Sequence, residues 1–76
     1  MADNLARQLA IETARAGLSM KFLLGRINFD RCYFYRLADG DKPGSNAAKK
    51  LERGIALARE VQQVIAKNTG ENHVAY

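Results

Sequence analysis

The sequence is poor in the residues that catalysis, metal binding and disulfide formation require. Its 76 residues include one cysteine, one histidine, one proline and no tryptophan. Cys32 cannot form an intramolecular disulfide by itself, which is typical of a reducing compartment. His73 has no second histidine and no nearby cysteine with which to form a metal site. Since a phosphate-binding glycine loop is also missing, we expect no enzyme activity, no cofactor, no metal and no small-molecule substrate.

Long hydrophobic runs and secretion signals are missing as well. No apolar run approaches the ~18–20 residues that a membrane-spanning helix needs. The N-terminal residues lack the apolar centre of a signal peptide. We therefore expect a soluble, cytoplasmic protein without a membrane partner.

The positive charge is concentrated in the middle of the chain. Acidic and basic residues balance within residues 1–18 and within residues 51–76, whereas residues 19–50 hold seven Lys and Arg against three Asp. This segment therefore accounts for the whole net charge of +4. A polyanion would bind there, but a lightly basic solvated surface would have the same composition. Charge alone leaves both interpretations open.

Apolar residues recur at intervals of three and four, which predicts helices and no strands. The predicted helices cover residues 4–16, 20–25, 30–38 and 45–67. Their predicted N-caps are Asp3 or Asn4, Ser19, Asp30, and Ser45 or Asn46. The residues predicted to end or follow them are Gly17, Asn28, Gly40 and Asn68–Gly70. The fold class is therefore all-α: a compact bundle of four to five helices with a long C-terminal helix, forming one domain over 1–70 and a tail over 71–76.

The expected core comes from one face of each helix. In the short second helix Leu23 is buried together with either Phe22 or Leu24, and in the third helix Phe34 and Leu37 share a face. The C-terminal helix has a first apolar stripe made of Ala47, Leu51, Gly54, Ile55, Ala58, Gln62 and Ile65. A second stripe beside it consists of Leu57, Val61 and Val64.

Together the two stripes cover an arc around the helix that is wider than the ~100° that one core contact needs. Either the N-terminal helix covers the additional width, or the second stripe is a subunit interface. A chain this short gains stability from dimerisation, which favours a homodimer through Leu57, Val61 and Val64.

Residues 18–40 resemble the helix-turn-helix of the lambda repressor, Cro and Xre family. Ser19 and, eleven residues later, Asp30 stand at the two helix caps of that unit, and Gly40 closes the second helix. The apolar positions of the family pattern are filled by Leu23, Ile27, Phe29, Phe34 and Leu37. A loop with proline, residues 41–44, follows as it does in the family, and the similarity extends from residue 5 to about residue 58.

Two positions depart from the family pattern. Leu24 stands where the family usually has alanine, which implies either a wider helix crossing or a register shifted by one, with Gly25 at the close contact. Asn28 replaces the usual glycine of the turn, a mild change because asparagine tolerates the left-handed conformation.

The resemblance implies a sequence-specific DNA-binding transcriptional regulator, Cro-like and expected to be a repressor, located with the nucleoid when bound. The helix at 30–38 would read the major groove of double-stranded DNA, since a helix fits that groove. The base-reading candidates are Arg31, Cys32, Tyr33 and Arg36. The phosphate-binding candidates are Ser19, Met20, Lys21, Tyr35, Lys42, Ser45, Asn46, Lys49 and Lys50.

The same residues allow a second hypothesis. A phage- or plasmid-encoded helical module, such as an inhibitor or anti-repressor, would use this scaffold to bind another protein. The aromatic run from Tyr33 to Tyr35 suits such an interface, because tyrosine and arginine dominate binding hot spots.

Overall fold

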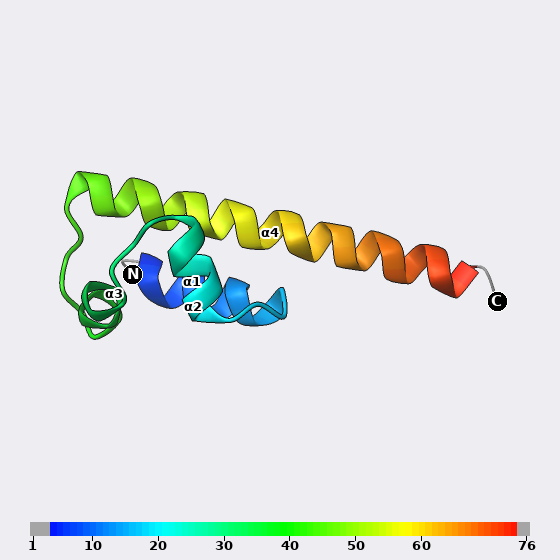
Figure 1. The fold of residues 1–76 in the computed structure, drawn as a ribbon, viewed down its shortest axis with the longest axis horizontal. Coiled ribbons are helices and arrows are strands. Elements are labelled where there is room, and N and C mark those ends of the chain that lie inside the picture. The colour runs from blue at the N-terminus through cyan, green and yellow to red at the C-terminus, as the bar shows by residue number, and fades with distance from the viewer. Residues whose placement is uncertain (1–3, 75–76) are drawn as a thin grey trace.

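The computed structural model describes the backbone of residues 4–74 and the side chains of residues 4–67. The helices are α1 (Leu5–Arg15), α2 (Met20–Arg26), α3 (Arg31–Ala38) and α4 (Ser45–Val74). No strand occurs between residues 4 and 74. The first three helices lie along the N-terminal half of α4 (Figure 1). The predicted all-α bundle with a long C-terminal helix is confirmed.

The first three helices begin where the sequence predicts. The side chains of Asn4, Ser19 and Asp30 each accept a hydrogen bond from the backbone N–H three residues further on. These bonds satisfy amides that have no partner inside the helix. Asn28 has a φ of 55°, the left-handed conformation expected of the turn between α2 and α3. Short polar caps and this turn therefore set the limits of α1, α2 and α3.

The last helix begins at the predicted residue, but its predicted N-cap and its predicted C-terminal end are wrong. The helix begins at Ser45, and the carbonyl of Gly44 accepts the first bond, from the amide of Ala48 at 2.9 Å. Gly44 therefore occupies the N-cap, and neither Ser45 nor Asn46 does. The helix also continues through 68–70 to Val74, because glycine inside a helix costs only about 1 kcal/mol and no proline follows.

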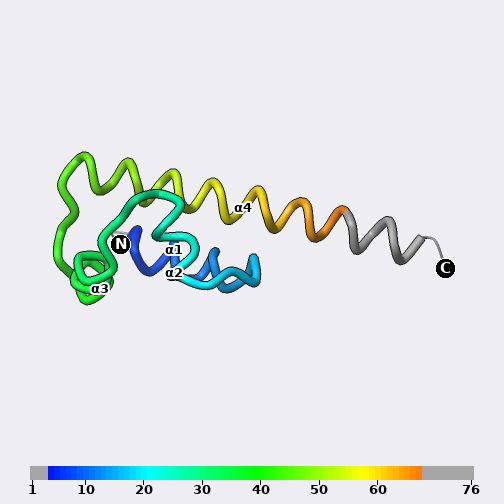
Figure 2. The backbone as a smooth tube through the Cα atoms, viewed as in Figure 1, coloured from blue at the N-terminus to red at the C-terminus, as the bar shows by residue number. Residues whose placement is uncertain are grey.

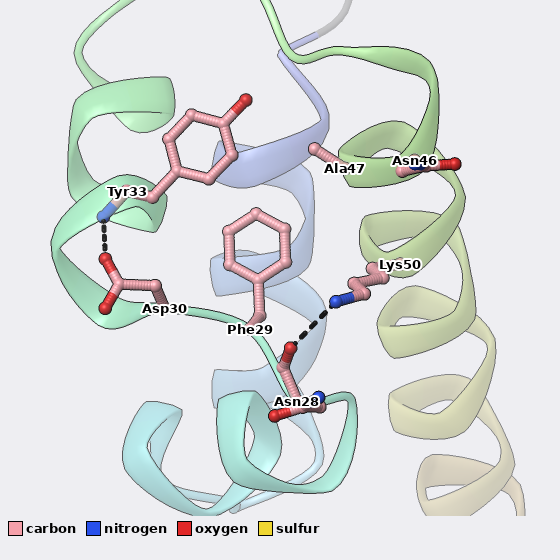
Figure 3. Close-up of a pocket in the computed structure, with 7 residues that line it drawn as sticks. All are labelled: Asn28, Phe29, Asp30, Tyr33, Asn46, Ala47 and Lys50. Carbon is pink, nitrogen blue, oxygen red and sulfur yellow. Dashed lines mark hydrogen bonds between the residues drawn. The ribbon is translucent and has the colours of Figure 1, made fainter.

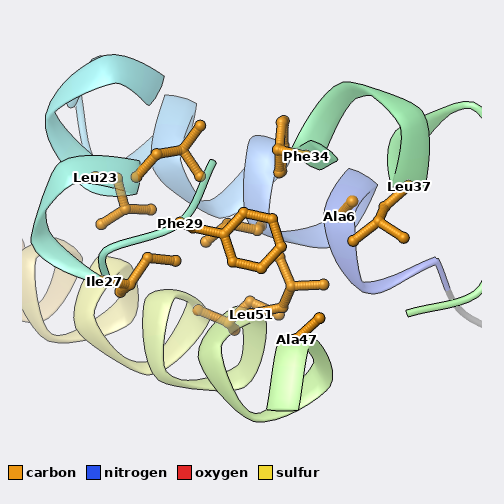
Figure 4. Close-up of a cluster of buried hydrophobic side chains, with 11 residues drawn as sticks. Ala6, Leu23, Ile27, Phe29, Phe34, Leu37, Ala47 and Leu51 are labelled. Atoms are coloured by element: carbon orange, nitrogen blue, oxygen red, sulfur yellow. The ribbon is translucent and has the colours of Figure 1, made fainter. Parts of the chain in front are cut away.

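The core joins α1, α2, α3 and α4 (Figure 4). The five apolar positions of the helix-turn-helix pattern, Leu23, Ile27, Phe29, Phe34 and Leu37, are all buried, as predicted. Leu24 is the second buried residue of α2, and the Phe22 side chain is 51% exposed. The choice left open by the sequence is therefore settled in favour of Leu24.

Gly54 of α4 lies close to side chains of the core. A Cβ atom on Gly54 would lie 2.9 Å from Leu9 Cδ1 and 3.2 Å from Ile27 Cδ1. Gly25 has no atom near the corresponding position, so the shifted register with Gly25 at a close contact is wrong.

A polar junction marks the end of the region that α1 covers. Gln62 Nε2 donates to both the Glu12 carbonyl oxygen (2.9 Å) and Glu12 Oε1 (2.7 Å), and Arg59 Nη2 lies 3.5 Å from Glu12 Oε2. The hydrogen bond from Gln62, and less strongly the positive charges of Arg59 and Arg15, lower the pKa of the Glu12 carboxyl against the opposing effect of burial. Residues 4–58 form the head of the molecule, and beyond them α4 runs past the ends of α1 and α2 (Figures 1 and 2).

Within the part of the chain that the structure describes, no helix combines the length and the apolar character needed to cross a membrane.

Candidate nucleic-acid interface

Helix α3, the predicted recognition helix, is fixed at both ends. Its first turn is capped by Asp30, whose Oδ2 accepts from the Tyr33 amide at 2.8 Å. At its C-terminal end, the carbonyl of Leu37 accepts from Asn4 Nδ2 at 3.0 Å and that of Ala38 from Arg7 Nε at 2.8 Å. The two contacts from α1 satisfy carbonyls that have no partner within α3. The orientation of α3 on the head is thus set by hydrogen bonds as well as by the core.

The outward face of α3 carries most of the predicted base-reading residues. Arg31, Cys32 and Arg36 are exposed, and Tyr35 beside them is 53% exposed. Cys32 is a free thiol. Arg36 Nε lies 3.5 Å from Asp41 Oδ2, in an ion pair whose two side chains remain largely in solvent. Such exposed pairs contribute ~0–1 kcal/mol, so the guanidinium can leave Asp41 at little cost.

Tyr33 is placed differently from the other base-reading candidates. Its ring stacks on Phe29 with the centroids 5.4 Å apart and the planes within 3° of parallel. The residue is half-buried, packs against the core and lines a groove between α3 and α4 (Figure 3). Its aromatic face therefore belongs to the wall of the groove, while Arg31 and Cys32 face solvent.

The groove joins the first turns of α3 and α4. It is lined by Asn28, Phe29, Asp30, Tyr33, Asn46, Ala47 and Lys50. Lys50 Nζ donates to the backbone carbonyl of Asn28 at 3.0 Å and so ties α4 to the turn before α3 (Figure 3). The groove thus brings two predicted phosphate-binding residues, Asn46 and Lys50, next to the start of the predicted recognition helix.

The remaining phosphate-binding candidates are spread over three elements. Lys21, Lys42, Ser45 and Lys49 are exposed. Ser19 is exposed but its hydroxyl caps α2 by accepting from the Phe22 amide at 3.1 Å. Met20 is half-buried and packs against the core.

Two contributions to the site were not anticipated from the sequence. The hydrogen bonds from Asn4 and Arg7 to the end of α3 join residues more than thirty positions apart, and the bond from Lys50 to Asn28 joins residues 22 positions apart. Helical periodicity reports which residues share a face, but it says nothing about such long-range pairs. The excess of positive charge in residues 19–50 was the only sign that Lys50 belongs near the turn.

Metal-binding residues are not gathered at this site. In the described part of the chain, no three His, Cys, Asp or Glu side chains lie together as a metal site would need. The side chain of His73 lies outside the described residues.

No family model, curated protein or solved structure matches this chain.

Proposed function

We propose that the protein is a sequence-specific DNA-binding transcriptional regulator that reads the major groove with α3. The observation that carries the proposal is a short helix, capped at its start and held at its end by Asn4 and Arg7, whose outward face presents Arg31, Cys32 and Arg36. A helix of this kind fits the major groove of B-DNA, and arginine pairs with guanine O6 and N7. A fixed helix keeps these side chains in one arrangement, which reading a sequence requires.

Contacts to the DNA backbone would come from the start of α4. The backbone amides of the first turn, at Ser45 and Asn46, have no partner inside the helix, and Lys49 is exposed one turn further along. Helix N-termini and nearby cations are the usual partners of phosphate groups. These residues would orient α3 on the duplex and add affinity without adding sequence preference.

The proposal extends to a Cro-like repressor that acts in the cytoplasm on the nucleoid, as a homodimer. One α3 reads only a few base pairs, and two copies related by a two-fold axis would read a near-palindrome. The second apolar stripe of α4, Leu57, Val61 and Val64, is the surface proposed for this pairing, because Val64 is 57% exposed and Val61 and Leu57 are only half-buried.

A protein-binding module is the second candidate, favoured by exposed aromatic side chains. Phe22 on α2 and Tyr35 on α3 are each about half exposed, and aromatic residues are enriched at protein interfaces. Such an interface would depend weakly on salt. DNA binding would weaken steeply with salt, because each neutralised phosphate releases a counterion.

Selection of bound duplexes from a random DNA library, followed by titration at several salt concentrations, tests the proposal. We expect recovery of a near-palindrome and an affinity that falls steeply as salt rises. Recovery of no preferred sequence, together with binding that hardly responds to salt, would refute DNA recognition and favour the protein-binding module.

Substitution of Arg31 sharpens this test. Arg31→Ala should weaken binding to the selected site by ~1–3 kcal/mol and relax the preference at one position, as expected for a lost base contact. Lys49→Ala is the matched control. It should weaken binding to all DNA sequences about equally, and it should lower the slope of log affinity against log salt concentration by about 0.9. Circular dichroism should report unchanged helix content for both variants, because both side chains are exposed. If Arg31→Ala bound the selected site like the parent, α3 would not be the reading helix.

A further inference from the structure

The second apolar stripe of α4 forms an apolar seam, with Leu57 at the end of the head and Val61 and Val64 beyond it. The spacing of four and then three residues is that of a coiled-coil core. Leu57 packs against the core of the head, but Val64 is 57% exposed. The first three helices end before the distal part of α4 (Figure 2). The seam forms a shallow groove together with Glu60, Gln63, Ile65 and Lys67.

The two edges of the seam have different chemistry. Glu60 and Lys67 are seven residues apart, so they lie on the same edge, one ahead of the other along the helix. Ile65 lies on the opposite edge and is 47% exposed. One edge therefore carries the negative charge of Glu60 followed by the positive charge of Lys67, and the other edge carries the apolar side chain of Ile65.

We infer that the seam binds the seam of a second copy of this chain in antiparallel orientation. In an antiparallel pair of helices, the charged edge of one copy meets the charged edge of the other, and the two apolar edges also meet. Glu60 then lies opposite Lys67 of the second copy, and the two-fold axis repeats this pair. A parallel arrangement instead sets Glu60 against Ile65 of the second copy, which removes water from a carboxylate without giving it a partner. Flanking charges of this kind set the orientation of paired helices.

The register follows from the same residues. We place the two-fold axis between the two helices, at the level midway between Val61 and Val64. Val61 of each copy then lies against Val64 of the other. At 1.5 Å per residue, Glu60 is then offset by only about 3 Å along the helix from Lys67 of the second copy, within reach of two long side chains. The two heads then lie toward opposite ends of the helix pair. This inference deepens the homodimer of the proposed function, and it does not require that α3 bind DNA.

Sedimentation equilibrium without DNA, on the full chain at micromolar concentration, tests the pairing. We expect a dimer for the parent and a helical monomer for Val64→Glu, whose charge would be buried in the seam. Because Val64 lies outside the core, circular dichroism should show that this variant keeps its helix content. A monomeric parent, or a Val64→Glu variant that dimerises like the parent, would overturn the inference.

Charge reversal tests the orientation. Glu60→Lys and Lys67→Glu should each raise the dimer dissociation constant about tenfold, since two exposed ion pairs become repulsive at once. The double variant restores opposite charges and should return to within about twofold of the parent. Glu52→Lys, an equal charge change at an exposed position outside the groove, is the matched control and should leave dimerisation unchanged. If the losses of dimer affinity caused by the two single substitutions add up in the double variant, the antiparallel pairing is wrong.

Cross-linking provides a second readout of orientation. In a Cys32→Ser background, a short bis-maleimide added to a mixture of Glu60→Cys and Lys67→Cys chains should link mainly unlike chains. A predominance of links between like chains would contradict the antiparallel arrangement. Because no DNA is present, these results are independent of the site selection, so a stable antiparallel dimer that selects no sequence would refute only the DNA-binding proposal.

Discussion

The head and the distal part of α4, residues 59–67, use similar apolar residues in different surroundings. In the head, Leu9, Leu23 and Phe34 are almost fully buried among side chains from four helices. In the distal part, Val64 and Ile65 are about half exposed. A helix presents an apolar face wherever the residues recur at the right interval, but only a second element can bury that face. The head has such elements within the same chain, whereas Val64 and Ile65 of the distal part stay about half exposed.

The largest expected difference between the two regions is in the cost of removing an apolar side chain. Phe34→Ala should lower the free energy of unfolding by ~3–5 kcal/mol, enough to unfold most of a domain this small. Val64→Ala, measured at a protein concentration low enough to favour monomers, should change it by less than about 0.5 kcal/mol. Thermal melts followed by circular dichroism compare the two. An unchanged melting temperature for Phe34→Ala would mean that this ring does not lie in the core.

A smaller effect is expected at Gly54, where α4 packs against Leu9 of α1 and against Ile27. Gly54→Val should destabilise the head by about 1–3 kcal/mol, because the new methyl groups would collide with Leu9 and Ile27 in a filled core. Gly25→Val is the matched control on α2, where no neighbouring atom lies near the added Cβ, and its effect should stay within about 0.5 kcal/mol. Chemical denaturation measures both variants. Equal effects at the two glycines would argue against a close approach of α1 and α4 at Gly54.

The smallest effect concerns the junction between the regions, and it depends on pH. The pKa of Glu12 is lowered from its ordinary value of 4.5 by the hydrogen bond from Gln62 and the nearby arginines. The folded state therefore holds the ionised carboxylate more strongly than the unfolded state does. This contribution is fully present above pH 4.5 and is lost as the pH falls through the lowered pKa.

The variant Glu12→Gln isolates this contribution. The melting temperature of the parent should exceed that of Glu12→Gln near neutral pH, and the difference should shrink as the pH falls below 4.5. Glu52→Gln, at an exposed position on α4, controls for the general loss of one negative charge. A parent-to-variant difference that stays constant from neutral to acidic pH would show that Glu12 contributes through packing alone.

Local sequence signals were sufficient for most of the fold. The caps at Ser19 and Asp30 and the turn at Asn28 depend on residues within three or four positions of one another, so they can be identified without knowledge of the rest of the chain. The burial of Phe34 and Leu37 followed from helical spacing. The N-cap and the C-terminal end of α4 were mispredicted because glycine is compatible with a helix cap, a helix end and a helix interior, and its neighbours decide among these roles.

The all-α class, the order of the helices, the faces that enter the core and the exposure of Arg31 and Arg36 could be predicted from the sequence, because these features depend on local hydrogen bonding and periodicity. Only the tertiary structure decided which helices touch and which side chains meet. In the structure Leu9 packs against Gly54, Gln62 donates a hydrogen bond to Glu12, and Lys50 donates one to the carbonyl of Asn28. These contacts join residues far apart in the chain, and their geometry depends on how the helices cross. For the same reason only the structure distinguished the covered part of α4 from the part that keeps an exposed seam.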